Sequence, residues 1–443
     1  MLCASLQPDF GRHLDAVFMM NDIGVEGMGG LITQVLLVLG GAILGLAVGW
    51  LMHKRRRSSV YLMDLACYAP PASLNISNSE LVQLGYQSGV FTEESMMFQQ
   101  KLIARSGLGN CTSMPPGITD ALRRGRAPSL EEAKAESYTV LTSVVGDLLC
   151  KAGVAPAEVD IVIVSCSCFN PTPSLAAMVV NHFDMKESTL TYNLGGMGCS
   201  SSLVSIDLAK HLLQALPNKR VLVISHENVT ACMYLGNEKS MLITNCLFRM
   251  GGAAVLMSNR PEDASSAKYS LMHTVRTHLG RRHDAFSCMG DAQDSEGIRG
   301  IHLQRNVVDI AQKALKANLM ALGPLVLPVA ELIAAVRKKD YIPDFRRAFD
   351  RFLIHTGGRG VIDAIQAGLS LTSEDCQPSF DTLHRFGNTS SASTWYILAR
   401  LEHTDSIRRG DRIWQLGFGG GFKCNSAVWK ARRDVSAPHP CWD

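Results

Sequence analysis

An uncharged apolar stretch near the N-terminus limits what the first part of this chain can fold into. Residues 29–52, GGLITQVLLVLGGAILGLAVGWLM, contain no charged side chain and only one strongly polar one, Gln34. About 20 apolar residues in a helix are enough to cross the hydrocarbon core of a bilayer. The basic run HKRRR follows at residues 53–57. The positive-inside rule then places the following domain in the cytosol and residues 1–28, an N-terminal tail, across the membrane.

Two other interpretations of residues 29–52 are a cleaved signal peptide and a buried core helix. A signal peptide has its basic residues before a shorter apolar region, whereas here they come after a long one. A core helix leaves the basic run unexplained. The chain also has thirteen cysteines, an odd number, and several lie in apolar stretches, which is typical of a reducing compartment. We therefore expect a membrane anchor over 29–52.

The composition of the rest excludes some classes of protein. With 47% hydrophobic residues, 19% charged residues and a net charge of +3, the chain is globular and lacks the basic field of a nucleic-acid-binding protein. No CxxC pair or Cys/His group occurs at zinc-finger spacing, so we expect no metal site.

After residue 58, short β-type runs alternate with helical patterns, which indicates an α/β architecture. A polar region at 259–305 predicts surface excursions between two halves, at 58–305 and 306–431, and the end of the chain, 432–443, reads as a loose tail. Strands are predicted at 60–68, 159–168, 220–225, 251–258, 352–355 and 412–417, and helices at 203–216 and 307–322.

The strongest chemical signal is TYNLGGMGCSSS at 191–202, followed by the helical pattern LVSIDLAKHLL. Glycines before a cysteine permit tight backbone geometry and put Cys199 at the start of a helix. There, free backbone N–H groups and the helix dipole stabilise a thiolate, the form that attacks a thioester. Cys111 in GLGNCTSMPPG is a weaker candidate because no helix evidently follows it.

A cysteine that accepts an acyl group needs hydrogen-bond donors for the enolate of a second substrate. FLIHTGG at 352–358 and LHRFGNTSS at 383–391 each end an apolar or helical run with polar groups and a glycine, and they offer His355 and Asn388. Asn388 is alternatively a turn residue. His278, in HTVRTH, alternates with small or apolar residues and is expected on a strand. The GFGGGF segment at 417–422 is a loop, with a phosphate cradle as the weaker alternative.

Ten segments together resemble the plant and algal 3-ketoacyl-CoA synthases, in family order from about residue 60 to 431. They are VYLMDLACYAPP, RSGLGNCTSMPPGI, VDIVIVSCSCFNPTPSLAAMVVNHF, YNLGGMGCSSSLVSIDLAK, SMLITNCLFRMGGAAVLMSN, HTVRTHLG, LGPLVLP, IHTGGRGVID, LHRFGNTSSASTWY and GDRIWQLGFGGGFKCNSAVWK.

The resemblance implies a thiolase-like fold of two similar halves in five αβαβα layers, as in the chalcone synthases. It also implies that Cys199 accepts the acyl group and that His355 and Asn388 promote malonyl decarboxylation. His384 falls on a family histidine, as does His278. The loop at 417–421 resembles the one that shapes the cavity of chalcone synthase relatives.

This sequence departs from the family pattern at Asn110 (usually Glu), His226 (usually Thr) and Arg351 (usually His). None of these replaces Cys199, His355 or Asn388, so activity is expected, with an altered chain-length preference. Many family members also have two membrane spans, whereas this sequence predicts one.

The expected reaction joins a long-chain acyl-CoA to malonyl-CoA and releases CO2, CoA and a 3-ketoacyl-CoA, with no metal or redox cofactor. The resemblance further implies an endoplasmic reticulum enzyme facing the cytosol, a homodimer, and association with the reductases and dehydratase of elongation. Two alternatives stay open: a type III polyketide synthase, which uses the same three residue types, and a catalytically silent scaffold subunit.

Overall fold

The structure, a computed structural model, describes residues 39–41, 45, 59–338 and 341–443. The chain divides into two compact units, Met1–Ser58 and Ser59–Asp443. The predicted tail at 1–28 and nearly all of the predicted anchor at 29–52 lie outside the described residues. Within the described ranges, no helix is both long and apolar enough to cross a membrane.

The first half of the second unit is built on five neighbouring strands, in the order β1-β7-β6-β4-β5. β6 and β4 pair in parallel, as do β4 and β5, while β7 runs antiparallel to both β6 and β1. The central strands are fully buried runs of valine, isoleucine and leucine, as expected for strands covered on both faces. Their bounds are β1 Tyr61–Cys67, β4 Ile161–Ser165, β5 Leu190–Leu194, β6 Arg220–His226 and β7 Gly252–Ser258.

The second half repeats the pattern with β8 (Tyr269–His278), β13 (Lys423–Ala431), β12 (Arg412–Gly419) and β11 (Arg351–Ile354). β12 pairs in parallel with β11 and antiparallel with β13. β8 is antiparallel to β13 along its whole length but meets β1 only at Tyr61↔Ser270 and Leu62↔Tyr269, so the two halves are joined by a narrow bridge.

The polar region 259–305 is thus more than a surface excursion, because it contains β8, a strand within the main sheet. β8 precedes residue 306 in the sequence but pairs with β13, which follows it. By strand pairing, therefore, the second half begins near residue 269, and the boundary at 305/306 stays a prediction from composition.

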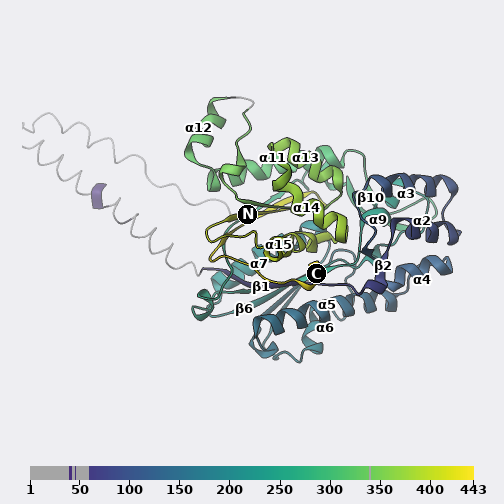
Figure 1. Cartoon of the computed structure of the whole chain (residues 1–443), viewed down its shortest axis with the longest axis horizontal. Coiled ribbons are helices and arrows are strands. Elements are labelled where there is room, and N and C mark those ends of the chain that lie inside the picture. The colour runs from purple at the N-terminus through teal and green to yellow at the C-terminus, as the bar shows by residue number, and fades with distance from the viewer. Residues whose placement is uncertain (1–38, 42–44, 46–58, 339–340) are drawn as a thin grey trace, which may run out of the picture. The chain divides into compact units, whose positions relative to one another are not determined.

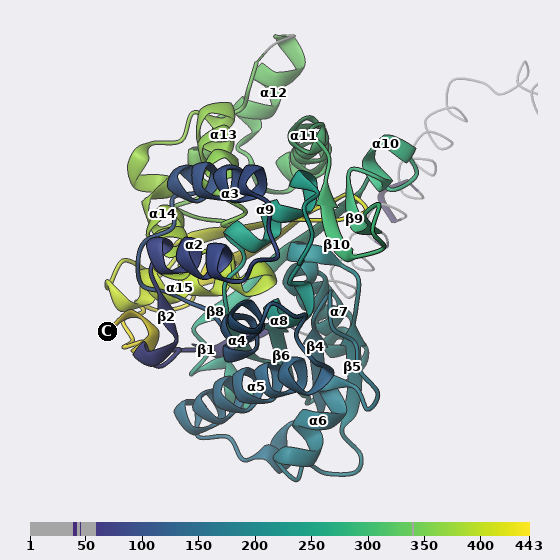
Figure 2. The same cartoon turned by 90° about the vertical axis from the view of Figure 1, so that its right-hand side faces the viewer.

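Helices cover the strands in layers (Figures 1 and 2). α5 (Leu130–Ala152) lies against β1, β6 and β7 on one outer side, with α6 (Leu175–His182) beside it, and α11 (Val307–Val326) lies against β8 and β13 on the other. α7 (Ser201–Ala215) and α15 (Ser393–His403) each contact strands of both halves, so they form the middle layer.

The remaining elements are shorter or lie around this body. They are β2 Asn75–Ile76, α2 Asn78–Gln87, α3 Glu93–Arg105, β3 Thr112–Ser113, α4 Pro116–Arg124, α8 Val229–Cys232, α9 Lys239–Leu247, α10 His283–Phe286, β9 Met289–Gln293, β10 Arg299–Leu303, α12 Val329–Arg337, α13 Arg359–Leu369 and α14 Ser373–Phe386. The described residues also form seven 3-10 turns, which include η3 (Gly198–Ser200) and η6 (Ser390–Ala392).

The C-terminal residues are packed, so the expectation of a loose tail is wrong. Cys441 is buried, and the indole N–H of Trp442 donates to the Tyr396 carbonyl at 3.0 Å. His439 lies 2.9 Å from the carboxylate of Glu402, which also accepts hydrogen bonds from Lys268 (2.7 Å) and Tyr269 (2.8 Å). Apolar and aromatic side chains in VSAPHPCWD, together with this buried carboxylate, attach the tail to α15.

Glu402→Gln should destabilise the fold by about 3 kcal/mol, because it leaves the buried Lys268 ammonium with Asp64 (2.6 Å) as its only carboxylate partner. Urea unfolding measures this change, and His403→Gln is the neighbouring control. Burial opposes ionisation of Glu402, but His439 and Lys268 hold its pKa at about 2. Since the folded pKa is depressed, the stabilisation is present above about pH 4.3 and is lost as the pH falls toward 2. An unchanged free energy of unfolding in Glu402→Gln would contradict this account.

Candidate active site

Cys199 lies in the short turn η3, immediately before α7, which confirms that it stands at a helix start. The turn follows β5 and passes very close to the other half of the molecule. Gly198 has φ 67°, and a Cβ there would lie 2.6 Å from the backbone nitrogen of Gly420. Only glycine fits this left-handed, crowded position, so the GMGC sequence is required by the approach of the two halves.

The structure does not give Cys199 the lowered pKa that its place at a helix start predicts. Desolvation of the half-buried Cys199 thiol raises its pKa to about 12, and the nearby carboxylate of Glu227 adds to the rise, whereas the neighbouring Ser390 hydroxyl opposes it. The desolvation of a thiolate therefore outweighs the helix dipole. Cys199 is protonated at neutral pH and needs a base at the moment of attack.

Asn388 follows α14 and is buried. Its backbone N–H donates to Leu247 (3.1 Å), and its carbonyl accepts from Arg249 (3.0 Å). The side-chain oxygen accepts the Ser390 N–H at 2.8 Å, which fixes the orientation of the amide. Its NH2 group makes no hydrogen bond to any described residue, so two donors are left for a ligand.

Ser390 links Asn388 to a buried carboxylate that sequence reasoning missed. It has φ 54°, a strained value for a residue other than glycine, and its hydroxyl donates to Glu227 at 3.0 Å. The other oxygen of Glu227 accepts the backbone N–H groups of Ser167 (3.0 Å) and Cys168 (2.8 Å). Glu227 directly follows β6, and its place at the carboxyl end of a buried parallel strand was the signal that could have identified it.

His355 directly follows β11, and its backbone N–H donates to the Leu416 carbonyl at 3.1 Å. Its ring is buried, and Nδ1 has no hydrogen-bond partner among the described residues. Burial lowers the pKa of His355 to about 4, because no nearby carboxylate stabilises the imidazolium. The ring is therefore neutral at physiological pH, with one nitrogen that accepts a proton and one that donates.

Backbone contacts bring these three residues to one place. The Thr356 hydroxyl, next to His355, donates to the Gly387 carbonyl, next to Asn388, at 3.1 Å. The Leu416 carbonyl accepts the His355 N–H, and the next residue, Gly417, lies against the nucleophile turn. A Cβ on Gly417 would lie 3.4 Å from Cα of Ser200. Thus the ends of β11, β12 and α14 meet the nucleophile turn.

His384 and His278 are not joined to these residues by any contact within the described part of the chain. His384 is exposed in the last turn of α14, where its carbonyl accepts the Gly109 N–H at 2.8 Å. His278 is exposed at the end of β8, as its strand pattern predicts, and pairs with Lys423 beside the turn at 420–422. The expectation of a loop over 417–422 is wrong for its first half, because residues 417–419 belong to β12. Any role for either side chain in catalysis stays a prediction.

The three departures from the family pattern lie in different environments. Asn110 is exposed and accepts the Asn78 N–H at 3.3 Å. Arg351 begins β11, at the opposite end of the strand from His355, and binds the Ser406 carbonyl at 2.9 Å through Nε. His226 ends β6, fully buried, with Nδ1 2.9 Å from the Gly251 carbonyl, so it alone is close to the Glu227 region.

One group of described residues has the composition of a metal site, but its contacts do not fit one. Potential ligand atoms of Cys168, Glu227 and Cys232 lie within 4.8 Å of one another. Both oxygens of Glu227 already accept hydrogen bonds, one from the Cys168 N–H and the other from the Ser390 hydroxyl. A metal would have to displace these partners.

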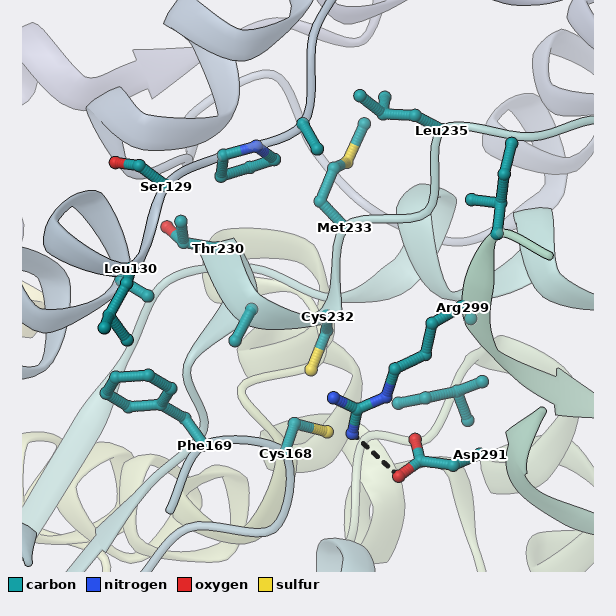
Figure 3. A pocket seen from close by; sticks show the side chains of 17 residues that line it. Ser129, Leu130, Cys168, Phe169, Thr230, Cys232, Met233, Leu235, Asp291 and Arg299 are labelled. Atoms are coloured by element: carbon teal, nitrogen blue, oxygen red, sulfur yellow. Dashed lines mark hydrogen bonds and ion pairs between the residues drawn. The ribbon is translucent and has the colours of Figure 1, made fainter. Parts of the chain in front are cut away.

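A pocket of about 340 Å³ opens beside this group, and we call it the Cys168 pocket (Figure 3). The sulfur atoms of Cys168 and Cys232 lie near one another in the pocket lining, and Arg299 pairs with Asp291 at 2.8 Å. Its lining is mostly apolar, with Leu130, Phe169, Ala231, Met233, Leu235 and Ile301 among the contributors. Cys199, His355 and Asn388 do not line this pocket; its link to them is the chain of hydrogen bonds from the Cys168 N–H to Glu227 and from the Ser390 hydroxyl to Glu227.

Comparison with protein families matches nearly the whole described body. Residues 51–339 match the model of the FAE1/type III polyketide synthase-like proteins, and residues 346–431 match the C-terminal domain of 3-oxoacyl-[acyl-carrier-protein] synthase III. The division falls inside the second half and leaves Cys199 in one model and His355 and Asn388 in the other.

Among curated proteins, the chain is similar to two 3-ketoacyl-CoA synthases of Arabidopsis thaliana. It is 49% identical to 3-ketoacyl-CoA synthase 2, over 86% of this chain and 74% of that protein. It is 46% identical to 3-ketoacyl-CoA synthase 11, over 86% of this chain and 76% of that protein. Among solved structures, it resembles 1,3,6,8-tetrahydroxynaphthalene synthase of Streptomyces coelicolor, a type III polyketide synthase, with a TM-score of 0.70, 18% identity and coverage of 84% of this chain and 99% of that one. This likeness shows the thiolase-like fold. The chain belongs to the 3-ketoacyl-CoA synthases, the condensing enzymes of very-long-chain fatty acid elongation.

Proposed function

We propose that Cys199 is the acyl-accepting nucleophile and that His355 and Asn388 promote the decarboxylation of malonyl-CoA. The observation that carries this proposal is the convergence of a protonated thiol, a neutral imidazole and an amide with two unused donors at the meeting point of the two halves. Each group has the protonation state that its step requires.

In the first step, the His355 imidazole takes the Cys199 proton as sulfur attacks the acyl-CoA carbonyl. The C–S bond to CoA breaks, and the proton passes to the departing CoA thiolate. In the second step, malonyl-CoA loses CO2, and His355 and Asn388 donate hydrogen bonds to the enolate oxygen. The enolate carbon attacks the acyl-Cys199 carbonyl, the C–S bond to Cys199 breaks, and the Cys199 thiolate takes up one proton from solvent, the proton that each turnover consumes.

The Cys168 pocket supports a site for the acyl chain. Most of its lining is aliphatic or aromatic, as a long alkyl chain requires, and Cys168 of that lining shares the hydrogen-bond acceptor Glu227 with Ser390. A chain attached to Cys199 would extend past Cys168 and Cys232 toward Met233 and Leu235. The volume available there would then set the longest substrate.

We place the enzyme in the endoplasmic reticulum membrane with its catalytic unit in the cytosol, held by residues 29–52. The uncharged stretch followed by HKRRR supports this position. A homodimer that works with the reductases and dehydratase of elongation, without a bound cofactor, is the assembly we propose. Such an anchor would hold the enzyme at a surface where long-chain acyl-CoA partitions.

Asn388→Asp tests the role of the amide. Aspartate keeps the acceptor for the Ser390 N–H but cannot donate to an enolate, so condensation should fall about 100-fold. Acylation of Cys199, measured separately without malonyl-CoA, should change less than threefold. Asn110→Asp, at an exposed asparagine, is the matched control. Equal losses in both half-reactions would contradict an enolate-specific role for Asn388.

The products of the unmodified enzyme test the alternative function. Cyclised polyketides among them would favour a polyketide synthase.

The pH dependence of acylation tests the state of His355. Because burial lowers the pKa of His355 to about 4, the base is neutral at pH 5.5, and kcat/KM for acyl transfer should change less than twofold between pH 7.5 and 5.5. An ordinary histidine with a pKa near 6.5 would instead produce a fall of about tenfold. Stopped-flow acylation over this range, with circular dichroism to verify folding, distinguishes the two results.

Cys232→Phe tests the Cys168 pocket. A larger side chain at its inner side should reduce kcat/KM for the longest accepted acyl-CoA about tenfold or more and leave short acyl-CoAs within twofold. Cys150→Phe, at an exposed cysteine, is the control. Mass spectrometry of the products from a panel of acyl-CoAs gives the chain-length profile. An unchanged profile would move the acyl chain to another part of the molecule.

A further inference from the structure

Four basic side chains gather at the end of the sheet where the second unit begins, and we call them the Arg409 patch. They are Arg409, Lys430, Arg432 and Arg433, and all four are exposed. A pocket of about 440 Å³ is lined by three of them together with Ser270, Gly410 and Ala431, with no acidic residue in the lining. The patch therefore has the composition of a surface for anions.

Nearby carboxylates do not neutralise this patch. None of its four members has a carboxylate within 4.0 Å in the described ranges of the chain. The acidic residues around it have other partners: Asp405 pairs with Arg408 at 3.0 Å, Asp411 with Arg351 at 3.6 Å, and Asp434 accepts the Arg409 backbone N–H at 2.7 Å. Positive charge is left exposed on this end of the sheet.

The patch lies where the chain enters the sheet. The guanidinium of Arg432 stacks 4.8 Å from the centre of the Tyr61 ring, and Tyr61 is the first residue of β1. Arg57 is four residue steps from Tyr61 and His53 is eight, so an extended chain would place them at most about 14 Å and about 28 Å from Tyr61.

The patch is also remote from the reaction. β12 begins near the patch at Arg412 and ends near the nucleophile turn at Gly419. A Cβ on Gly419 would lie 2.6 Å from the Ser200 hydroxyl oxygen. Seven steps along a strand cover about 23 Å. The side chains of the patch therefore do not contact the reacting atoms at Cys199.

We propose that the Arg409 patch docks on the anionic phospholipid headgroups of the membrane that holds the anchor. This inference rests on the membrane position proposed above. Headgroup phosphates and carboxylates would bind Arg409, Lys430 and Arg433, while Arg432 is partly held by Ser270 (3.1 Å) and Ala264 (2.9 Å). Because the patch is at the opposite end of β12 from Cys199, docking would turn the nucleophile end away from the headgroups.

The test uses the full chain in nanodiscs of phosphatidylcholine with about 30% phosphatidylserine that carries a photoreactive headgroup. Crosslinked peptides identified by mass spectrometry should include 409–412 and 430–433. The triple variant Arg409→Glu, Lys430→Glu, Arg433→Glu should reduce these crosslinks at least fivefold while condensation activity stays within twofold. The control variant is Lys101→Glu, Lys313→Glu, Lys316→Glu, at three exposed lysines outside the patch. It changes the total charge by the same amount and should keep the crosslinks at 409–412 and 430–433.

Crosslinks confined to peptides before residue 59, or equal crosslinking in the triple variant and the unmodified chain, would overturn the docking surface. If the chain fails to enter any nanodisc, the anchor and the docking surface are both overturned, but the roles of Cys199, His355 and Asn388 are not. If the unmodified chain is crosslinked to headgroups at the patch but carries out no condensation, the catalytic proposal alone is overturned.

Discussion

The whole site depends on the close approach of two backbone turns from the two halves of the molecule. Gly198 lies against the backbone of Gly419 and Gly420, with no room for a side chain between them. This contact puts Cys199 at the ends of β11 and β12, which come from the other half. If the two turns were separated by even the thickness of a methyl group, the nucleophile would move away from the strand ends that carry its partners.

Burial then determines the chemistry. The same desolvation raises the pKa of Cys199 and lowers that of His355, so the resting pair is a thiol and a neutral imidazole. An ion pair of thiolate and imidazolium would react faster with thioesters but would be costly to bury here, beside the carboxylate of Glu227. The arrangement leaves both groups uncharged until a substrate arrives, and Ser390 and Glu227 hold the polar groups in place.

Much of this could be predicted from the sequence because the signals were local. Apolar runs predicted β4, β6, β7, β11 and β12 to within a few residues, and the glycines before Cys199 predicted a tight turn at a helix start. What could not be predicted depends on contacts between distant residues. The Ser390–Glu227 hydrogen bond joins positions far apart in the chain, and the pKa of Cys199 depends on atoms from several elements. The tail at 432–443 was misjudged because its packing partner, α15, lies outside its own sequence pattern.

The central claim is that Cys199 carries the acyl group, and a single-turnover experiment tests it most directly. The full chain is mixed with a long-chain acyl-CoA in the absence of malonyl-CoA, and the peptide that contains Cys199 is examined by mass spectrometry. The account predicts one acyl group on Cys199, discharged as a 3-ketoacyl-CoA when malonyl-CoA is added, and no acylation in Cys199→Ala. An acyl group on another residue, or product formation by Cys199→Ala, would contradict it.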